Sequence, residues 1–181
     1  MSGSMKTRVG LSGSALKWIA VITMAIDHMG ASILEAYTLN AWGGSPLGGM
    51  FVRKWDEILA VDQVLRYIGR PAFPIFCFLL VQGFIHTHDV KRYAIRLGIF
   101  ALISEVPFDL ALHIRPFYPE KQNVFFTLLI GLLVIWFIKT HKDTLPYRVA
   151  GILTGAALAE LLHTDYGGFG VALIVLLYLL K

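Results

Sequence analysis

A single apolar stretch near the start of the chain, Leu16–Leu34, constrains what this protein can be. As a helix it is long enough to cross a bilayer, because about 20 apolar residues span the hydrocarbon core. The stretch nevertheless carries Asp27 and His28 side by side. On a helix that starts at Leu16, His28 lies ~18 Å along the axis, just past the midplane. An ionisable pair at that depth costs several kcal/mol unless something compensates it, so this pair is the predicted chemical centre.

The composition indicates that the rest of the chain is of the same kind. Hydrophobic residues make up 56% of the 181 residues and charged residues 15%, whereas soluble domains contain about 25% charged residues. We therefore expect an all-α, polytopic membrane protein with a single domain over residues 1–181. Met-Ser-Gly-Ser before Met5 is interpreted as an addition to the natural sequence. The first apolar run is too long for a cleavable signal peptide and lacks a small-residue cleavage site.

Hydropathy, with glycine and proline as breaks, predicts a helix bundle of about six membrane spans. A glycine-rich loop at Ala41–Gly49 and an amphipathic helix over residues 53–69, expected on the membrane surface, separate the first span from the second. Gly151 and Gly155 have GxxxG spacing, which predicts close packing of their helix on a neighbour. The six predicted spans are Leu16–Leu34, Pro71–Ile85, Tyr93–Leu112, Val124–Ile138, Val149–Leu162 and Phe169–Leu180.

The distribution of lysine and arginine orients these spans. With the N-terminus inside, ten of the sixteen basic residues fall in cytoplasmic segments, as the positive-inside rule favours, and both termini are cytoplasmic. Counted from Asp165, the last span reaches ~24 Å of a ~30 Å core, so it is either locally embedded or continued beyond Lys181 in the natural protein. The inner basic residues are Lys6, Arg8, Lys17, Lys91, Arg92, Arg96, Lys139, Lys142, Arg148 and Lys181, and the outer ones are Arg53, Lys54, Arg66, Arg70, Arg115 and Lys121.

Under this topology the polar residues within the membrane gather in its outer half, which favours a shared cavity. Arg70 starts a helix, where its charge opposes the helix dipole, and is better explained by an anionic partner such as Asp27, Glu105 or Asp109. A purely structural salt bridge remains open for Arg70, Glu105 and Asp109. Besides the Asp27–His28 pair, the set comprises Arg70, Glu105, Asp109, Asn123, Thr127, Glu160, His163 and Asp165.

The individual side chains have a functional and a structural interpretation. His28 fits a general base whose ring a carboxylate orients, and the alternative is a hydrogen-bonded core histidine. The only cysteine, Cys77, is interpreted as a small buried hydrophobe. The His86–Asp89 run lies at a span end without a clear ligand set, so we expect a solvated turn and no metal site.

A basic group near the inner surface has two interpretations as well. Its side chains either snorkel to the lipid headgroups or meet phosphates that enter from the cytoplasm. Because the basic residues sit at span ends, the net charge of +4 does not indicate nucleic-acid binding. The group consists of Lys91, Arg92 and Arg96.

Five sequence blocks between Leu16 and Val171 resemble the TraX family. They are LKWIAVITMAIDHMG, IGRPAFPIFCFLLVQGFIHT, ISEVPFDLAL, NVFFTLLIGLL and DYGGFGV, in this order, and the first two are long and specific. The family is similar to a wider group of transmembrane acyltransferases, and its name-giving member acetylates the amino terminus of conjugative pilin. The resemblance implies an acetyl-CoA-dependent acetyltransferase of the bacterial inner membrane, with His28 at the position of an essential embedded histidine. Family members are often somewhat longer.

The resemblance assigns chemistry to the polar set. An α-amino group has a pKa of ~7.7–8.0, so His28 would take its proton as it attacks the thioester, while Asp27 holds the imidazole tautomer. The thioester oxygen becomes an oxyanion and needs a donor. Donors or cavity partners would be Arg70, Glu105, Asp109, Asn123 and Thr127; the acetyl-CoA site would include Gln82, Gly83, His86, Lys91, Arg92 and Arg96; and the acceptor site would include Glu160, His163, Asp165 and Tyr166.

The expected acceptor is the N-terminal amine of a peptide or small protein, either pilin-like or a ribosomally made peptide. One alternative is an O-acetyltransferase of cell-surface glycan, with the acceptor residues binding sugar hydroxyls. The alternative outside enzymology is a small proton-coupled transporter in which Asp27, Glu105 and Asp109 relay protons; it would release no thiol from acetyl-CoA. The expected partners are the acceptor and membrane lipid, without nucleic acid, and a homo-oligomer is left open.

Overall fold

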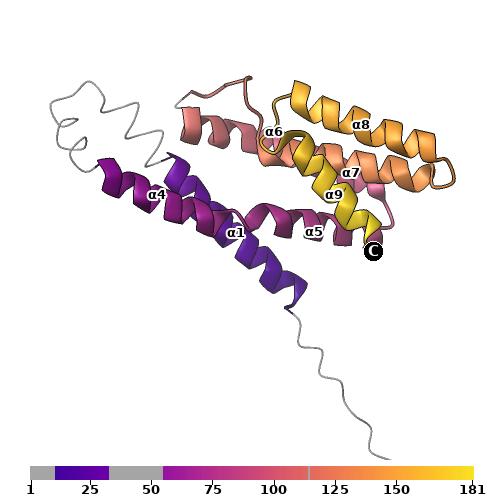
Figure 1. Cartoon of the computed structure of the whole chain (residues 1–181), viewed down its shortest axis with the longest axis horizontal. Coiled ribbons are helices and arrows are strands. Elements are labelled where there is room, and N and C mark those ends of the chain that lie inside the picture. Colours follow the sequence, from indigo (N-terminus) through magenta and orange to yellow (C-terminus); the bar gives the residue numbers. More distant parts are fainter. Residues whose placement is uncertain (1–10, 33–54, 114) are drawn as a thin grey trace, which may run out of the picture.

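The computed structural model describes residues 11–32, 55–113 and 115–181, and over these ranges the chain is a bundle of α-helices without a named strand (Figure 1). The all-α class expected from the sequence is therefore confirmed. The predicted loop at Ala41–Gly49 lies outside the described residues. The helices are α1 (Gly13–Met29), α4 (Trp55–Gly69), α5 (Ala72–His86), α6 (Val90–His113), α7 (Val124–Thr140), α8 (Leu145–Leu161) and α9 (Gly167–Leu179).

Helix α1 carries the Asp27–His28 pair and begins three residues before the predicted span. Ser12 starts it, because the Ser12 hydroxyl accepts a hydrogen bond of 3.1 Å from the Ala15 amide and satisfies one of the free N–H groups of the first turn. The regular helix ends at Met29, and residues 30–32 continue it as a π-helical turn. The end of the predicted span beyond residue 32 lies outside the described residues.

Helices α4 and α5 follow each other almost without interruption, separated by Arg70 and Pro71. Proline is tolerated there because the first helical amides have no partner within the helix. Among the described residues one helical stretch, Leu59–His86, is long and apolar enough to cross a membrane, while Val124–Thr140 and Gly167–Leu179 are shorter apolar helices. The sequence places the start of this span at Pro71; in the structure most of α4, predicted as a separate surface helix, belongs to the same stretch.

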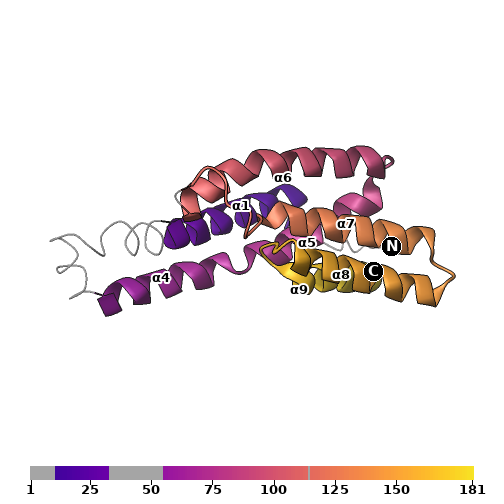
Figure 2. The same ribbon diagram turned by 90° about the horizontal axis from the view of Figure 1, so that it is seen from above.

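The two halves of the molecule pack on each other through α5. Helix α1 runs in the opposite direction to α4 and contacts both α4 and α5 (Figure 1). In the other half, α7 packs on α6, α8 and α9, and Figure 2 shows α7 between α6 and the other two. Helix α5 also contacts α7 and α9, so it joins the α1–α4 pair to this bundle. The buried core follows these contacts and includes Phe73, Cys77, Phe84, Leu132, Ile135, Val171 and Ile174.

Small residues set the closest approaches between helices. A Cβ added at Gly151 would lie 2.6 Å from the Phe137 ring, and one at Gly155 would collide with Val134. Both neighbours belong to α7, so the close packing that the GxxxG spacing predicts is confirmed for α8. In the other half, a Cβ at Gly30 would lie 2.9 Å from Asp62 Oδ1 of α4. Glycines therefore bring α1 and α4 together next to the Asp27–His28 pair.

Candidate functional site

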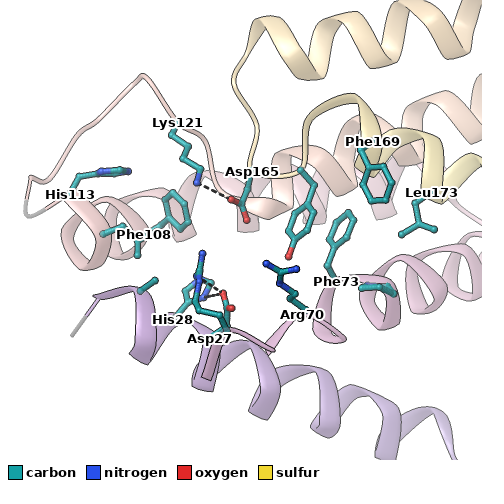
Figure 3. Close-up of a pocket in the computed structure, with 15 residues that line it drawn as sticks. Asp27, His28, Arg70, Phe73, Phe108, His113, Lys121, Asp165, Phe169 and Leu173 are labelled. Carbon is teal, nitrogen blue, oxygen red and sulfur yellow. Dashed lines mark hydrogen bonds and ion pairs between the residues drawn. The ribbon is translucent and has the colours of Figure 1, made fainter. Parts of the chain in front are cut away.

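A cavity of about 890 Å³ lies where the α1–α4 pair meets α5, α6 and α9. This volume is within the range of small-molecule sites, which measure about 300–1,000 Å³. Figure 3 shows the polar pair of α1 on one side of it and apolar side chains of α5 and α9 on the other. The lining residues are Asp27, His28, Ala31, Arg66, Arg70, Phe73, Pro74, Phe108, Leu112, His113, Lys121, Asp165, Tyr166, Phe169 and Leu173.

Asp27 is held by Arg66 of the neighbouring helix. Arg66 Nη1 donates to Asp27 Oδ2 at 3.1 Å, which is the distance of a charge-assisted hydrogen bond. Gly69, one turn further along α4, makes room for this contact, because a Cβ there would lie 2.7 Å from Asp27 Oδ1. The guanidinium and the carboxylate neutralise each other at the floor of the cavity.

His28 points into the same space from the next position of α1. Its Nδ1 lies 3.8 Å from Asp27 Oδ2, the oxygen that Arg66 also binds, and is buried without a hydrogen bond to the described residues. The ring faces Phe108 of α6 at 6.2 Å between centroids. An imidazole nitrogen next to a carboxylate, in a cavity, is the arrangement of a general base whose ring is oriented by an acid.

Arg70 lines the cavity but does not pair with Asp27. Among the described residues it forms no ion pair, and its guanidinium lies over the Tyr67 ring at 5.2 Å from the centroid. The anionic partner that its position predicts is therefore not found in the described part of the chain, where Arg66 takes that role. Arg66 and Arg70 are four residues apart, so both side chains reach the same face of the helix.

The loops at the opposite wall contribute a second ion pair and a phenol. Lys121 Nζ lies 3.3 Å from Asp165 Oδ1, and the dashed line in Figure 3 marks this pair. The Tyr166 ring stacks on Phe73 with 3.6 Å between centroids and 5° between planes. Burial, with the charges of Asp165 and Asp27 adding to it, raises the pKa of Tyr166 to about 12, so its phenol stays protonated and able to donate.

Four residues predicted for the cavity do not line it and make hydrogen bonds to other parts of the chain. Asn123 Nδ2 donates to Glu105 Oε2 at 2.5 Å and to the Ala101 carbonyl at 2.9 Å. Both N–H groups of this side-chain amide are therefore already hydrogen-bonded. Asp109 is fully buried and accepts from the Tyr118 amide at 2.7 Å. Thr127 is fully buried and meets the Tyr166 amide at 3.5 Å. None of the four lines the cavity, and a role for them in the site stays a prediction.

Two of the predicted acceptor residues hold loops in place. Glu160 Oε1 accepts from the Gly168 amide at 2.7 Å, next to Gly167, which has a positive φ of 48°. The His163 carbonyl accepts from the Gln122 amide at 3.1 Å. Both side chains lie on a shallower cavity of about 400 Å³. Asp165 and Tyr166 are the two that reach the main cavity.

A second cavity, of about 750 Å³, lies at the other end of α1 and brings basic residues together. Lys17 of α1 faces Arg92 and Arg96 of α6 across walls that are mostly apolar. Gly83 also lines the second cavity. Tyr93 packs closely on Gly83, because a Cβ at Gly83 would lie 2.9 Å from the Tyr93 hydroxyl. The other residues predicted for acetyl-CoA, namely Gln82, His86 and Lys91, do not line this cavity.

Comparison with known proteins identifies the family. Residues 12–181 match the family described as TraX protein. The chain belongs to the TraX family. A relative from Dichelobacter nodosus, named "Probable fimbrial assembly protein FimC, serogroup H1", is 28% identical over 181 residues. The match covers 96% of this chain and 64% of the relative, so the chain spans just under two thirds of that protein's length. No solved structure matches the chain.

The sequence predicts no role in the site for three ionisable residues that line the cavity of this TraX family chain: Arg66, His113 and Lys121. Arg66 was assigned to the outer face of a surface helix, although its spacing to Arg70 was a usable signal. His113 ends α6 and stacks on Tyr118 at 4.0 Å between centroids, and Lys121 lies in the loop before α7. Loop residues of this kind carry no periodic signal, so hydropathy cannot bring them to a site.

Proposed function

We propose that this chain is a multi-pass enzyme of the bacterial inner membrane that moves an acetyl group from acetyl-CoA to an N-terminal amine. The observation that carries the proposal is the position of His28. Its imidazole lies in a cavity beside Asp27, whose charge Arg66 balances, in a chain that belongs to the TraX family. The oriented imidazole supplies the base that acyl transfer to an amine needs.

In the proposed reaction the neutral amine attacks the thioester carbonyl carbon. The new C–N bond forms and the C–S bond breaks. His28 takes the proton that the amine loses and returns it to the departing thiolate, which leaves as free thiol. Asp27 keeps the imidazole in one orientation and stabilises its protonated form. Atoms and charges balance without a metal or a redox partner.

The charges around the cavity favour the reactive form of the acceptor. Arg66, Arg70 and Lys121 bring three positive charges, and Asp27 and Asp165 bring two negative ones. An excess of positive charge favours loss of the proton from an ammonium ion bound in the cavity, and so favours the neutral amine that attacks. Arg70, which has no ion pair among the described residues, and the protonated Tyr166 phenol are the proposed donors to the developing oxyanion.

The second cavity is the proposed site for the CoA part of the donor. Its three basic side chains suit phosphates, although Arg92 also pairs at 3.4 Å with Asp89, which lines the cavity too. Its apolar walls suit a thin flexible chain. Lys17 and His28 are eleven residues apart on α1, which corresponds to roughly 16 Å. The two cavities share no lining residue, so side chains of the described residues separate them. Binding of the donor then requires these side chains to move.

The family and the named relative bear on the acceptor. Because the relative is named as a fimbrial assembly protein, a pilin-like subunit is the first acceptor to test for this chain. A short peptide with a free amino terminus represents it in an assay.

The test uses the purified full chain in detergent or nanodiscs, acetyl-CoA and such a peptide. We expect release of free thiol and a peptide heavier by one acetyl group, both seen by mass spectrometry and a thiol reagent. His28→Ala should lower the rate by about 10²-fold or more, since a positioned general base contributes typically 10²–10⁴. The matched control is His141→Ala, because His141 lies at the C-terminal end of α7. A native rate for His28→Ala, or no thiol release from the wild type, would reject the proposal.

A further inference from the structure

The main cavity has a polar half and an apolar half. Figure 3 shows Asp27 and His28 at one side, and three apolar side chains at the other: Phe73, Phe169 and Leu173. The reaction described above uses only the polar half. The apolar half therefore has no role in the chemistry itself, although it lies in the same space.

Packing against neighbouring side chains and against α9 holds the rings of the apolar half in place. Phe73 is almost fully buried and stacks in parallel on Tyr166, which fixes both rings. A Cβ at Gly170 would lie 2.9 Å from Phe73 Cζ, so α9 packs directly behind the ring. Phe169 and Leu173 stand one turn apart on α9 and continue the surface. These four side chains, Phe73, Tyr166, Phe169 and Leu173, form what we call the aromatic ledge.

A carboxylate lies between the ledge and the catalytic pair. Asp165 directly precedes Tyr166 in the chain, and one of its oxygens, Oδ1, is bound by Lys121 at 3.3 Å. A carboxylate has about four lone-pair sites, so Oδ2 remains available for another cation. A free peptide amine arrives mostly as an ammonium ion at neutral pH. Asp165 and His28 line the same cavity, so an ammonium ion bound by Asp165 would enter the space that His28 also faces.

We propose that the aromatic ledge and Asp165 form the acceptor subsite, and that it selects a peptide whose first residue has a large apolar side chain. The inference rests on the proposed acetyl transfer and adds the class of acceptor. Asp165 receives the terminal ammonium and the ledge receives the first side chain. Apolar side chains gain free energy on leaving water in proportion to the area they bury, while polar ones lose hydrogen bonds to water without replacement.

The first experiment compares peptides that differ only in their first residue. Five-residue peptides with Leu, Phe, Ser or Asn in front of Ser-Gly-Ala-Gly-amide are given to the wild-type chain at saturating acetyl-CoA. We expect kcat/KM for Leu and Phe to exceed that for Ser and Asn by about tenfold or more, as burial of one large apolar side chain allows. Equal values for the four peptides would overturn the proposal.

The second experiment asks whether the ledge causes the preference. Phe169→Ser should reduce the Leu-to-Ser ratio by severalfold. Phe117→Ser is the matched control, because Phe117 is exposed to the same extent, 71%, but does not line the cavity. Since both side chains are exposed, neither change removes core packing. A ratio unaffected by Phe169→Ser would mean that Phe169 only faces lipid, and would overturn the subsite.

The third experiment measures binding without acetyl-CoA, which separates this proposal from the catalytic one. Asp165→Asn should weaken binding of the Leu peptide severalfold and leave binding of the same peptide with an acetylated amine unchanged, while Asp143→Asn, in the exposed turn before α8, changes neither. If no peptide is acetylated but the Leu peptide still binds more tightly than the Ser peptide, the acetyl transfer is rejected and the subsite stands. If Leu and Ser peptides bind equally, or Asp165→Asn binds the free amine normally, the subsite is rejected.

Discussion

At the scale of single residues, one carboxylate oxygen serves two partners. Asp27 Oδ2 lies 3.1 Å from Arg66 Nη1 and 3.8 Å from His28 Nδ1. The shorter contact fixes the carboxylate, and the longer one leaves room for the imidazole to approach when it becomes protonated. Opposite charges attract more strongly than a charge and a neutral ring, so proton transfer to His28 tightens this contact. In the proposed reaction, Arg66 would thus act through Asp27 as a positioning residue.

This arrangement predicts different roles for Arg66 of α4 and for Arg70, which directly follows that helix. Arg66→Leu leaves Asp27 with an uncompensated charge and should lower the free energy of unfolding by about 1–3 kcal/mol, less than for a fully buried pair because Arg66 is partly exposed. Within the described part of the chain Arg70→Leu loses its contact with the Tyr67 ring and no ion pair, so the unfolding transition should stay near its native value, while the acetyl-transfer rate falls. Thermal unfolding in detergent, read together with the transfer rate, checks both.

The reverse order of stabilities would contradict this assignment. If Arg70→Leu unfolded at a lower temperature than Arg66→Leu, then the partner of Asp27 would be Arg70, as the sequence suggested. Arg66→Lys gives a further check, since lysine keeps the charge but not the planar fork of donors, and its stability should fall between the native chain and Arg66→Leu.

At the scale of elements, helix positions were predictable and helix rotations were not. Each predicted span corresponds to a helix, because apolar runs bounded by glycine, proline and polar residues carry a strong local signal. The four-residue spacing of Glu105 and Asp109 correctly puts them on one face of α6. That face turns toward Asn123 and Tyr118 and away from the cavity, and nothing in a single sequence fixes the rotation of a helix about its axis.

The pairing of α1 with α4 was missed for a related reason. An amphipathic helix with charges at both ends suits a membrane surface, so the hydropathy pattern of α4 does not predict that it packs on another helix. The contact depends on Gly69, where the missing side chain lets Asp27 approach Arg66. A glycine at the end of a helix is equally well explained as a stop signal, and only the structure separates the two interpretations.

Gly69 therefore provides a prediction at the level of the helix pair. Gly69→Ala places a Cβ where Asp27 now lies, so α1 and α4 must move apart. We expect a loss of about 1–3 kcal/mol in stability and a lower transfer rate, because crowding in a packed contact costs this much and misplaces the catalytic pair. Gly13→Ala is the control, because a Cβ at Gly13 meets nothing within 4 Å. Native stability and rate in Gly69→Ala would show that the two helices are not held this closely.

At the scale of the whole molecule, α1 connects the two cavities. Its C-terminal part carries Asp27 and His28 on the main cavity, and its N-terminal part carries Lys17 on the second. The predicted topology puts the second cavity toward the cytoplasm, where acetyl-CoA is found, and the main cavity in the outer half of the membrane. Donor and acceptor can then approach from different sides and meet along one helix.

The proposal that CoA binds in the second cavity and the acceptor in the main cavity can be tested by charge reversal. Arg92→Glu together with Arg96→Glu should raise the KM for acetyl-CoA by roughly tenfold at low salt, and less at high salt, because salt screens contacts with phosphates near a surface. The KM for the peptide should stay near its native value, since neither residue lines the main cavity. Lys91→Glu changes the neighbouring charge on a side chain outside the second cavity and should leave the KM for acetyl-CoA nearly unchanged. A larger effect of Lys91→Glu than of the double change would place the CoA phosphates near Lys91 and outside the second cavity.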